Sequence, residues 1–325
     1  MRVGLMGLGR IGAFHAATLA AHPRVGELVV SDADEERAAQ VAARFGAQVG
    51  DAFDADAVVI ATPTATHAGL VMRACAKGVP VLCEKPVAPS VTETLQVLEA
   101  VRQSGTVVHI GFQRRFDAGY TAAREALHGG ELGALHRVHM VTADPGPPAP
   151  GYVPLSGGIF RDCHIHDFDI LRWVTGREVE SVYATGANRG AAFFAEAGDV
   201  DNSAALLTLD DDTLVTLQGS RYNGGGYDVR MELAGTLRTQ VVGLDPRAPL
   251  TGAEGLQPPG EPWPDFATRF EAAYIAELGA FLAAARGERE SPCTVEDALA
   301  ALYVAEAAEL SRRAGRPVRL EEVSG

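Results

Sequence analysis

The first third of the chain alternates short apolar runs with amphipathic segments, and this alternation restricts the possible folds more than any other feature. The apolar runs are typical of buried parallel strands and cover residues 3–6, 28–31, 57–61, 79–83 and 107–111. The amphipathic segments between them are typical of helices and cover residues 11–21, 35–45, 67–77 and 90–104. Because strands that alternate with helices form right-handed βαβ units, the pattern predicts an α/β fold with a doubly wound parallel sheet.

The pattern changes after residue 118. Alternating apolar and polar residues predict half-exposed strands at 135–142, 204–209, 213–219, 228–233 and 238–242. Further helices are predicted at 118–128, 159–175, 266–285 and 295–314. The 325 residues are therefore predicted to form two domains. Residues 1–118 hold the parallel sheet, and residues 119–325 form an α+β domain with a mostly antiparallel open sheet.

The charge balance excludes several kinds of partner. The chain has 28 Lys and Arg against 42 Asp and Glu, so its net charge is 28 − 42 = −14. A nucleic-acid partner or an anionic membrane surface requires a basic face, so neither is expected. No apolar stretch approaches the roughly 20 residues of a membrane span, and the first glycine motif comes too early for a signal peptide. The four cysteines are scattered, which is typical of reduced thiols in a cytoplasmic protein.

A G-x-G-x-x-G motif, Gly7-Leu8-Gly9-Arg10-Ile11-Gly12, lies directly after the first predicted strand and opens a helix. This is the context that a dinucleotide-binding site needs. Gly7 allows a tight turn, Gly9 lets the backbone approach a pyrophosphate, and Gly12 lets helix and strand pack closely. Asp32 ends the second strand, where its carboxylate can accept hydrogen bonds from both ribose hydroxyls and repel a 2′-phosphate. The motif therefore predicts NAD rather than NADP; the alternative is a plain glycine turn with a solvated aspartate.

Two further segments follow strands at the same edge of the predicted sheet. Thr62, Pro63, Thr64 and His67 follow the third strand and are predicted to line the cofactor crevice. A helix start with Thr66 as its N-cap is an alternative that is compatible with this role.

The second segment is Glu84-Lys85-Pro86, which follows the fourth strand. Glu84 and Lys85 are predicted to face the cofactor, and the Lys85 ammonium could donate to a substrate hydroxyl. Pro86 permits a cis peptide bond before it. The alternative is a surface lysine paired with Glu84. His15, on the first helix, has no predicted role.

The densest group of chemically active residues is Asp162-Cys163-His164-Ile165-His166-Asp167-Phe168-Asp169. In a helix, Asp162, His166 and Asp169 share one face. A carboxylate one turn away can orient an imidazole, so His166 is a candidate general base, whereas His164 points elsewhere. Two alternatives remain: a metal site of a hydrolase or isomerase built on His164 and His166, and a purely structural capped helix.

A glycine-rich turn at residues 221–226 precedes Tyr227. This tyrosine could reach a substrate hydroxyl. The alternative is an aromatic side chain that packs on a sheet face.

Several of these motifs fall in the order found in one known family. The glycine motif, Ala-Thr-Pro-Thr-Ala-Thr-His, Glu-Lys-Pro, Gly-Phe-Gln-Arg-Arg-Phe-Asp at 111–117 and the motif at 157–170 follow one another in register. With them the chain resembles the glucose–fructose oxidoreductase, inositol dehydrogenase and rhizopine catabolism (Gfo/Idh/MocA) family over nearly its whole length. The segment at 144–158 is most similar to inositol 2-dehydrogenases.

The resemblance implies a Rossmann domain followed by an α/β domain whose open sheet often builds dimers or tetramers. It implies that Lys85, Asp162 and His166 are catalytic and that Tyr152 and Tyr227 lie on the substrate side. The implied reaction is the NAD-dependent oxidation of a cyclic polyol or sugar hydroxyl to a ketone, and myo-inositol oxidised to 2-keto-myo-inositol is the leading candidate. Another sugar or inositol isomer, or a non-catalytic NAD-binding regulator, are the alternatives. The pair Cys163-His164 departs from the family pattern, in which these positions are more often apolar or hydroxylic.

Overall fold

Residues 1–255 and 258–324 are described by the structure, which is a computed structural model. They divide into two compact units that are not continuous in sequence. The first unit comprises Met1–Gln113 and Tyr274–Leu299, and the second comprises Arg114–Ala273 and the chain from Ala300 onward. A single division near residue 118 does not describe these units, because a C-terminal segment returns to the first one.

The first unit contains a parallel sheet, as the sequence predicts, but the sheet has six strands because the short β3 was not among the five predicted. Its order is β3-β2-β1-β4-β5-β6, so the chain leaves β1 on one side and returns on its other side. The strands are β1 (Arg2–Met6), β2 (Glu27–Ser31), β3 (Gln48–Val49), β4 (Ala57–Ile60), β5 (Val81–Glu84) and β6 (Val108–Gly111). The connecting helices are α1 (Arg10–Ala21), α2 (Glu35–Phe45), α3 (His67–Lys77) and α4 (Val91–Ser104). The order reverses at β1 and β4, which is where doubly wound folds bind ligands.

The core of the first unit includes residues from far along the chain. The helix predicted at 266–285 is two helices, α9 (Phe266–Arg269) and α10 (Glu271–Ala285). Leu278, Phe281 and Leu282 of α10 are fully buried in one cluster with strand residues such as Leu5 and Val30. Sequence periodicity predicts the buried face of α10 but does not identify the sheet against which this face packs.

The second unit contains a seven-stranded mixed sheet in the order β12-β11-β7-β10-β9-β8-β13. Neighbouring strands are antiparallel except for β7 and β10, which are parallel, so the predicted mostly antiparallel sheet is confirmed. The strands are β7 (Leu135–Ala143), β8 (Val179–Ala187), β9 (Asn202–Leu209), β10 (Leu214–Ser220), β11 (Asp228–Gly235), β12 (Thr239–Val242) and β13 (Val318–Arg319). The helices are α5 (Ala118–His128), α6 (Ile159–Asp162), α7 (Ile165–Thr175), α8 (Phe193–Glu196), α9, most of α11 (Val295–Ala314) and α12 (Glu321–Ser324).

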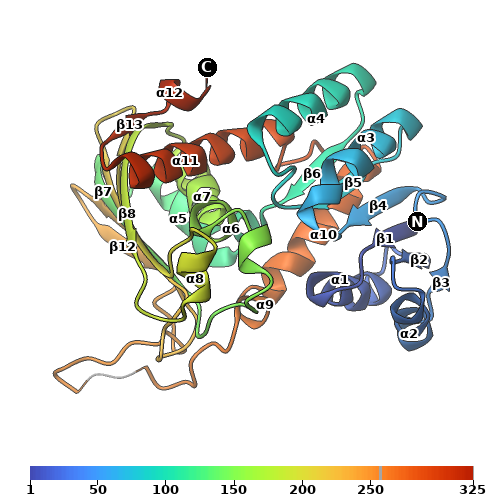
Figure 1. Cartoon of the computed structure of the whole chain (residues 1–325), viewed down its shortest axis with the longest axis horizontal. Helices are drawn as coiled ribbons and strands as arrows, with labels where there is room; N and C mark the ends of the chain where they lie inside the picture. Colours follow the sequence, from blue (N-terminus) through green and yellow to red (C-terminus); the bar gives the residue numbers. More distant parts are fainter. Residues whose placement is uncertain (256–257, 325) are drawn as a thin grey trace. The chain divides into compact units, whose positions relative to one another are not determined.

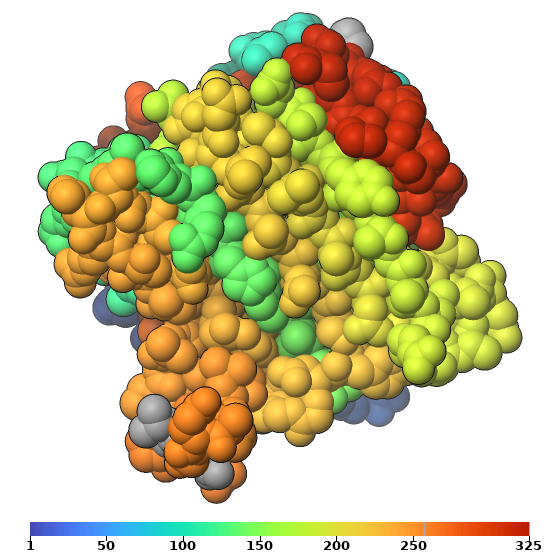
Figure 2. Space-filling view, turned by 90° about the vertical axis from the view of Figure 1, so that its left-hand side faces the viewer, coloured from blue at the N-terminus to red at the C-terminus, as the bar shows by residue number. Residues whose placement is uncertain are grey.

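The two faces of this sheet differ. Figure 1 shows α5 and α7 along one face. The other face turns toward the viewer in Figure 2, where strands of the sheet reach the surface side by side. Leu206 and Leu214 remain about half exposed there, at 46% and 52%.

Two local features shape the segments that carry the candidate site. The helix predicted at 159–175 is interrupted at Cys163 and His164, which separate α6 from α7. The peptide bond between Lys85 and Pro86 is cis. Within residues 1–255 and 258–324, every helix is too short or too polar to cross a bilayer.

Candidate active site

The glycine motif between β1 and α1 has the backbone that a dinucleotide requires. Gly7 has a φ of +83°, and a Cβ there would lie 2.6 Å from the carbonyl oxygen of Ala61. At Gly12 a Cβ would overlap the carbonyl oxygen of Gly7, whereas at Gly9 it would meet nothing within 4 Å. The absence of a side chain at Gly9 leaves space beside the start of α1, where the backbone N–H groups of a helix N-terminus can receive a phosphate. The residues present fit the pyrophosphate of NAD.

Asp32 lies just after β2 and faces the glycine loop. Its Oδ2 accepts a hydrogen bond from the Leu8 amide at 2.6 Å, and its Oδ1 accepts from the Asp34 amide at 2.9 Å. The Arg37 guanidinium lies 3.2 Å from Oδ1. Burial opposes ionisation of Asp32, but the two amides and Arg37 outweigh it and hold the pKa of the carboxyl below its ordinary value. Asp32 is therefore a fixed anion beside the glycine loop.

The loop after β4 is held by its own side chains. Thr62 and Thr66 share a hydrogen bond of 2.7 Å between their hydroxyls, and the Thr66 hydroxyl donates to the carbonyl oxygen of Pro63. Thr66 makes no side-chain cap to α3, so the suggested capping role is wrong. Thr64 begins a short 3₁₀ turn that ends at Thr66. Both ring nitrogens of His67 face protein carbonyl groups, so this residue acts on the loop rather than reaching a cofactor through a ring nitrogen.

Lys85 follows β5 at the carboxyl edge of the same sheet, directly before the cis bond to Pro86. The Oε1 of its neighbour Glu84 lies 2.7 Å from the Nε2 of His15, which is fully buried in α1. The sequence assigned no role to His15, because a lone histidine in a helix does not indicate its partner. In the structure, the contact between His15 and Glu84 connects the end of β5 to α1, the helix that follows the glycine motif.

In the second unit, Asp162 ends α6 and accepts two strong hydrogen bonds. The Tyr152 hydroxyl donates to its Oδ1 at 2.8 Å, and the Arg221 guanidinium donates to its Oδ2 at 2.7 Å. Arg221 is nearly buried and also contacts Asp144 at 3.2 Å. Burial, followed by the charge of Asp162, raises the pKa of the Tyr152 hydroxyl, which therefore stays protonated as a donor. The sequence predicted Asp162 and Tyr152, but not that Arg221 would join them.

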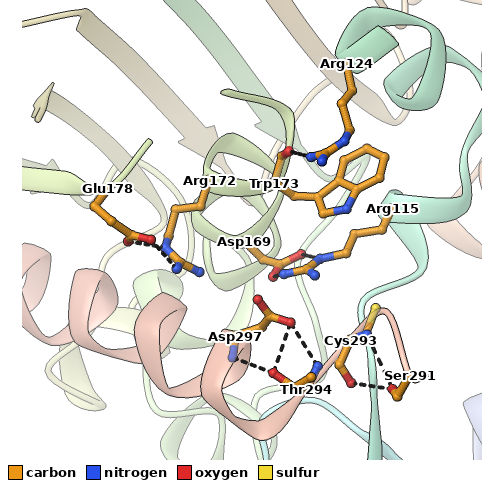
Figure 3. A network of polar contacts seen from close by, with 10 residues as sticks. All are labelled: Arg115, Arg124, Asp169, Arg172, Trp173, Glu178, Ser291, Cys293, Thr294 and Asp297. Carbon is orange, nitrogen blue, oxygen red and sulfur yellow. Dashed lines mark hydrogen bonds and ion pairs between the residues drawn. The ribbon is translucent and has the colours of Figure 1, made fainter. Parts of the chain in front are cut away.

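His166 lies in the first turn of α7, past the break in the helix. Asp169, three residues along the same helix, forms a buried ion pair with Arg115, whose Nε lies 2.9 Å from Oδ2 (Figure 3). This pair anchors α7, which the sequence did not indicate. The helical periodicity was correct for α7 itself but did not identify Arg115 as the partner.

His164 lies at the break and is engaged through both ring nitrogens. Its Nδ1 lies 2.7 Å from Asp167 Oδ2, and its Nε2 lies 2.7 Å from Ser203 Oγ on β9. Asp167 also pairs with the buried Arg114 and accepts from Thr142. A metal ion at His164 would have to displace these partners. Among residues 1–255 and 258–324, no group of three or more His, Cys, Asp or Glu side chains is arranged to hold a metal.

Tyr227 directly precedes β11, and it is only 5% exposed. Its ring makes an edge contact with Phe270, with ring centroids 6.5 Å apart. Burial raises the pKa of its hydroxyl, so this group is protonated at neutral pH. Its role toward a substrate stays a prediction.

Comparisons with known proteins agree with this geometry. Residues 1–112 match the family model described as oxidoreductase family, NAD-binding Rossmann fold, and residues 120–239 match the GFO/IDH/MocA C-terminal domain. The chain is 34% identical to scyllo-inositol 2-dehydrogenase (NAD(+)) of Bacillus subtilis, with 99% of this chain and 96% of the relative covered.

Solved structures agree as well. A myo-inositol dehydrogenase from Corynebacterium glutamicum is 34% identical, with a TM-score of 0.90 and 98% of each chain covered. A scyllo-inositol dehydrogenase from Lactobacillus casei, solved with bound cofactor NAD(H) and scyllo-inositol, is 26% identical, with a TM-score of 0.90 and 99% of each chain covered. The chain, an oxidoreductase with an NAD-binding Rossmann domain, belongs to the Gfo/Idh/MocA family.

Proposed function

We propose that the protein oxidises one hydroxyl of a cyclic polyol to a ketone with NAD, and that myo-inositol, oxidised to 2-keto-myo-inositol, is its substrate. One observation carries the proposal: in a chain of this family, a fixed carboxylate at Asp162 is held between a tyrosine hydroxyl and a buried arginine. Relatives named as inositol dehydrogenases support the choice of substrate.

The proposed roles divide between cofactor and substrate. Gly7, Gly9, Arg10, Ile11 and Gly12 hold the pyrophosphate. Asp32 holds the adenosine ribose and excludes a 2′-phosphate. When bound, NAD supplies the hydride acceptor, and the protein supplies placement and electrostatics.

Three side chains are proposed to handle the hydroxyl proton. His166 accepts the proton, Asp162 orients His166 and the hydroxyl, and Lys85 helps to polarise the hydroxyl and relay the proton. The anchored geometry of Asp162 supports this role, because its two oxygens are already oriented by Tyr152 and Arg221. Tyr227 is proposed as a further contact to the polyol.

A substrate screen tests the proposal directly. Purified protein is incubated with inositol isomers, hexoses and sugar acids, with NAD or NADP, and formation of the reduced cofactor is followed. We expect turnover with at least one inositol isomer and a clear preference for NAD. NAD binding without turnover on any of these compounds would instead support a non-catalytic regulator.

Lys85→Ala and His166→Ala are each expected to lower kcat/KM by about 10²- to 10⁴-fold, which is the usual contribution of a positioned acid or base. Steady-state kinetics on the best substrate provide the measurement. Lys77→Ala is the control, because Lys77 is exposed on α3. Its Nζ forms a long ion pair of 3.8 Å with Asp54, which is also exposed. Near wild-type turnover in either active-site variant would remove that residue from the mechanism.

We further propose that the protein is a cytoplasmic homo-oligomer, a dimer or tetramer. The half-exposed Leu206 and Leu214 on the open sheet face support the oligomer, and the buried thiols of Cys75 and Cys83 support a reducing compartment. Light scattering of the purified protein measures the number of subunits; a monomer at micromolar concentration would contradict the proposed assembly.

A further inference from the structure

His67 makes an unusual pair of contacts in the first unit. Its Nδ1 lies 2.7 Å from the carbonyl oxygen of Pro86, and its Nε2 lies 2.7 Å from the carbonyl oxygen of Thr62. His67 is the first residue of α3, and it is 1% exposed. Carbonyl oxygens only accept hydrogen bonds, so each ring nitrogen must donate one. A histidine donates from both nitrogens only when it carries a proton on each.

Other arrangements of the ring are less favourable. A neutral ring would place a nitrogen lone pair against a carbonyl oxygen at 2.7 Å, which is repulsive in a buried site. Turning the ring by half a revolution would bring ring carbons to both oxygens and remove both hydrogen bonds. Two charge-assisted hydrogen bonds, in contrast, offset the desolvation of the cation.

The two carbonyl groups belong to different loops at the carboxyl edge of the sheet. Thr62 lies in the loop after β4, and Pro86 directly follows Lys85 in the loop after β5. The ring therefore ties these loops together. On the other side of Lys85, Glu84 is tied to α1 through the buried His15 at 2.7 Å. A buried histidine therefore contacts the residue on each side of Lys85, through the side chain of Glu84 and through the backbone carbonyl group of Pro86.

We propose that His67 is a doubly protonated imidazolium that braces the two loops and thereby positions Lys85 for the reaction. His67 is a positioning residue, since its nitrogens face only backbone oxygens. The part of the inference that concerns Lys85 rests on the proposed function, whereas the protonation of His67 does not.

Nuclear magnetic resonance of the histidine ring nitrogens tests the protonation in the full-length protein. The protein is labelled in its histidines and measured at about pH 8, where an unperturbed imidazole with a pKa of ~6.5 is mostly neutral. We expect one histidine with two protonated-type ring nitrogens, and this signal is lost in His67→Asn. A His67 spectrum with one protonated and one unprotonated nitrogen would overturn the proposal, whatever the enzyme's activity.

His22 provides the matched reference in the same spectra. Its Nδ1 accepts a hydrogen bond from the Arg24 amide, and burial together with Arg24 lowers its pKa. His22 is therefore expected to show one unprotonated nitrogen at the same pH. Loss of its signal in His22→Asn assigns it.

A double-mutant cycle tests the positioning of Lys85. We expect His67→Asn to lower kcat by about 10- to 100-fold per folded molecule, because misplacing a reacting group by about 1 Å has an effect of this order. In a Lys85→Ala background the same change should cost little more, since the two residues act through one group. His22→Asn should keep wild-type kcat. Losses that multiply in the double variant would overturn the role of His67 in positioning Lys85.

If His67→Asn does not fold, the protonation measurement on the wild-type protein still decides the first half of the proposal, with signals assigned by sequential correlation. If no polyol is turned over, the proposed function fails while the spectrum of His67 still gives its own answer. The two failures are therefore distinguishable.

Discussion

Three buried histidines make polar contacts close to the candidate site residues. His15 contacts Glu84, His67 contacts two carbonyl groups, and His164 joins Asp167 to Ser203. Each side chain is at most 1% exposed. A buried polar group is tolerated when its hydrogen bonds are made. Among the described residues, His67 and His164 have partners at both ring nitrogens, whereas His15 has one at Nε2 only. Their spacing in the sequence shows none of these partners.

Tyr120 shows the opposite case, a buried hydroxyl without a partner. Its side chain is fully buried in α5, its hydroxyl makes no hydrogen bond within the part of the chain that the structure describes, and burial raises its pKa to about 12. Replacing the hydroxyl removes an unsatisfied donor, so Tyr120→Phe is expected to raise the free energy of unfolding by about 1 kcal/mol. Urea denaturation measures this. The exposed Tyr183 provides the control variant Tyr183→Phe, with no expected change, and a destabilised Tyr120→Phe would show that the hydroxyl has a partner.

Gly219 leaves the space that His164 occupies. A Cβ at Gly219 would overlap the His164 imidazole and lie 2.8 Å from Ser203 Oγ. Gly219→Ala is therefore expected to lower the free energy of unfolding by about 1–3 kcal/mol, the usual effect of overpacking. In a His164→Ala background the loss should be smaller, as measured by denaturation of all four combinations.

Gly69→Ala is the control for this cycle. Gly69 lies inside α3 with nothing within 4 Å of a Cβ, so alanine there should stabilise the helix by roughly 0.5–1 kcal/mol. An equal loss from Gly219→Ala in both backgrounds would mean that His164 is not the neighbour that requires glycine.

At the scale of elements, a short segment after β6 anchors the helix that carries His166. Arg114 and Arg115 lie in a 3₁₀ turn and pair with Asp167 and Asp169 of α7. All four side chains are buried. Two consecutive arginines thus form ion pairs with two aspartates that are two residues apart. The two pairs together restrict the rotation of α7 about its axis and its position along that axis. The Arg-Arg motif was visible in the sequence, but its spatial partners were not.

Asp167 should make the free energy of unfolding depend on pH in the acidic range. Burial opposes its ionisation, but Arg114 and the hydrogen bonds from His164 and Thr142 outweigh it and lower the pKa below the ordinary 3.8. A carboxyl with a lowered native pKa contributes fully above its ordinary pKa and loses this contribution as pH falls toward the native pKa.

We therefore expect Asp167→Asn to lower the free energy of unfolding by about 3–5 kcal/mol near neutral pH, because it leaves Arg114 buried and unpaired. The difference from wild type should shrink below about pH 4. Denaturant titrations at several pH values measure both effects. Asp54→Asn, at an exposed ion pair, should change stability by less than about 1 kcal/mol, and a pH-independent Asp167→Asn difference would contradict the ionic origin.

The helix break at Cys163 and His164 also belongs to this scale. The sequence predicted one helix over 159–175, because apolar residues continue at helical spacing through the break. In the structure the His164 ring reaches Ser203 on β9 and Asp167 in the next turn. The break therefore coincides with a contact to a distant strand, which local periodicity does not reveal.

At the scale of the whole molecule, the first unit needs a segment that the chain supplies only near its end. Leu278, Phe281 and Leu282 are fully buried in the core of the parallel sheet. A fragment of residues 1–118 would expose the surface that these side chains cover. We expect it to lack a cooperative unfolding transition in circular dichroism, since burying three large side chains contributes about 1.5–3 kcal/mol each.

A fragment that joins residues 1–113 to 274–299 through a flexible linker is the control, because these are the two segments of the unit. It should unfold cooperatively. A stable, cooperative 1–118 fragment would show that α10 is dispensable for the first unit.

The sequence by itself determined the elements and the chemistry that depends on neighbours in the chain. Helical and strand periodicity, and glycines placed after a strand, are local signals, so they predicted the parallel sheet, the mostly antiparallel second sheet and the NAD loop. Lys85, Asp162 and His166 were likewise proposed from short motifs of neighbouring residues. The tertiary structure alone decided which side chains meet: Arg221 with Asp162, Arg115 with Asp169, α10 with the first sheet, and His67 with two carbonyl groups. These pairings join residues from different elements, and the energy of a buried polar contact depends on a partner whose distance in sequence carries no signal.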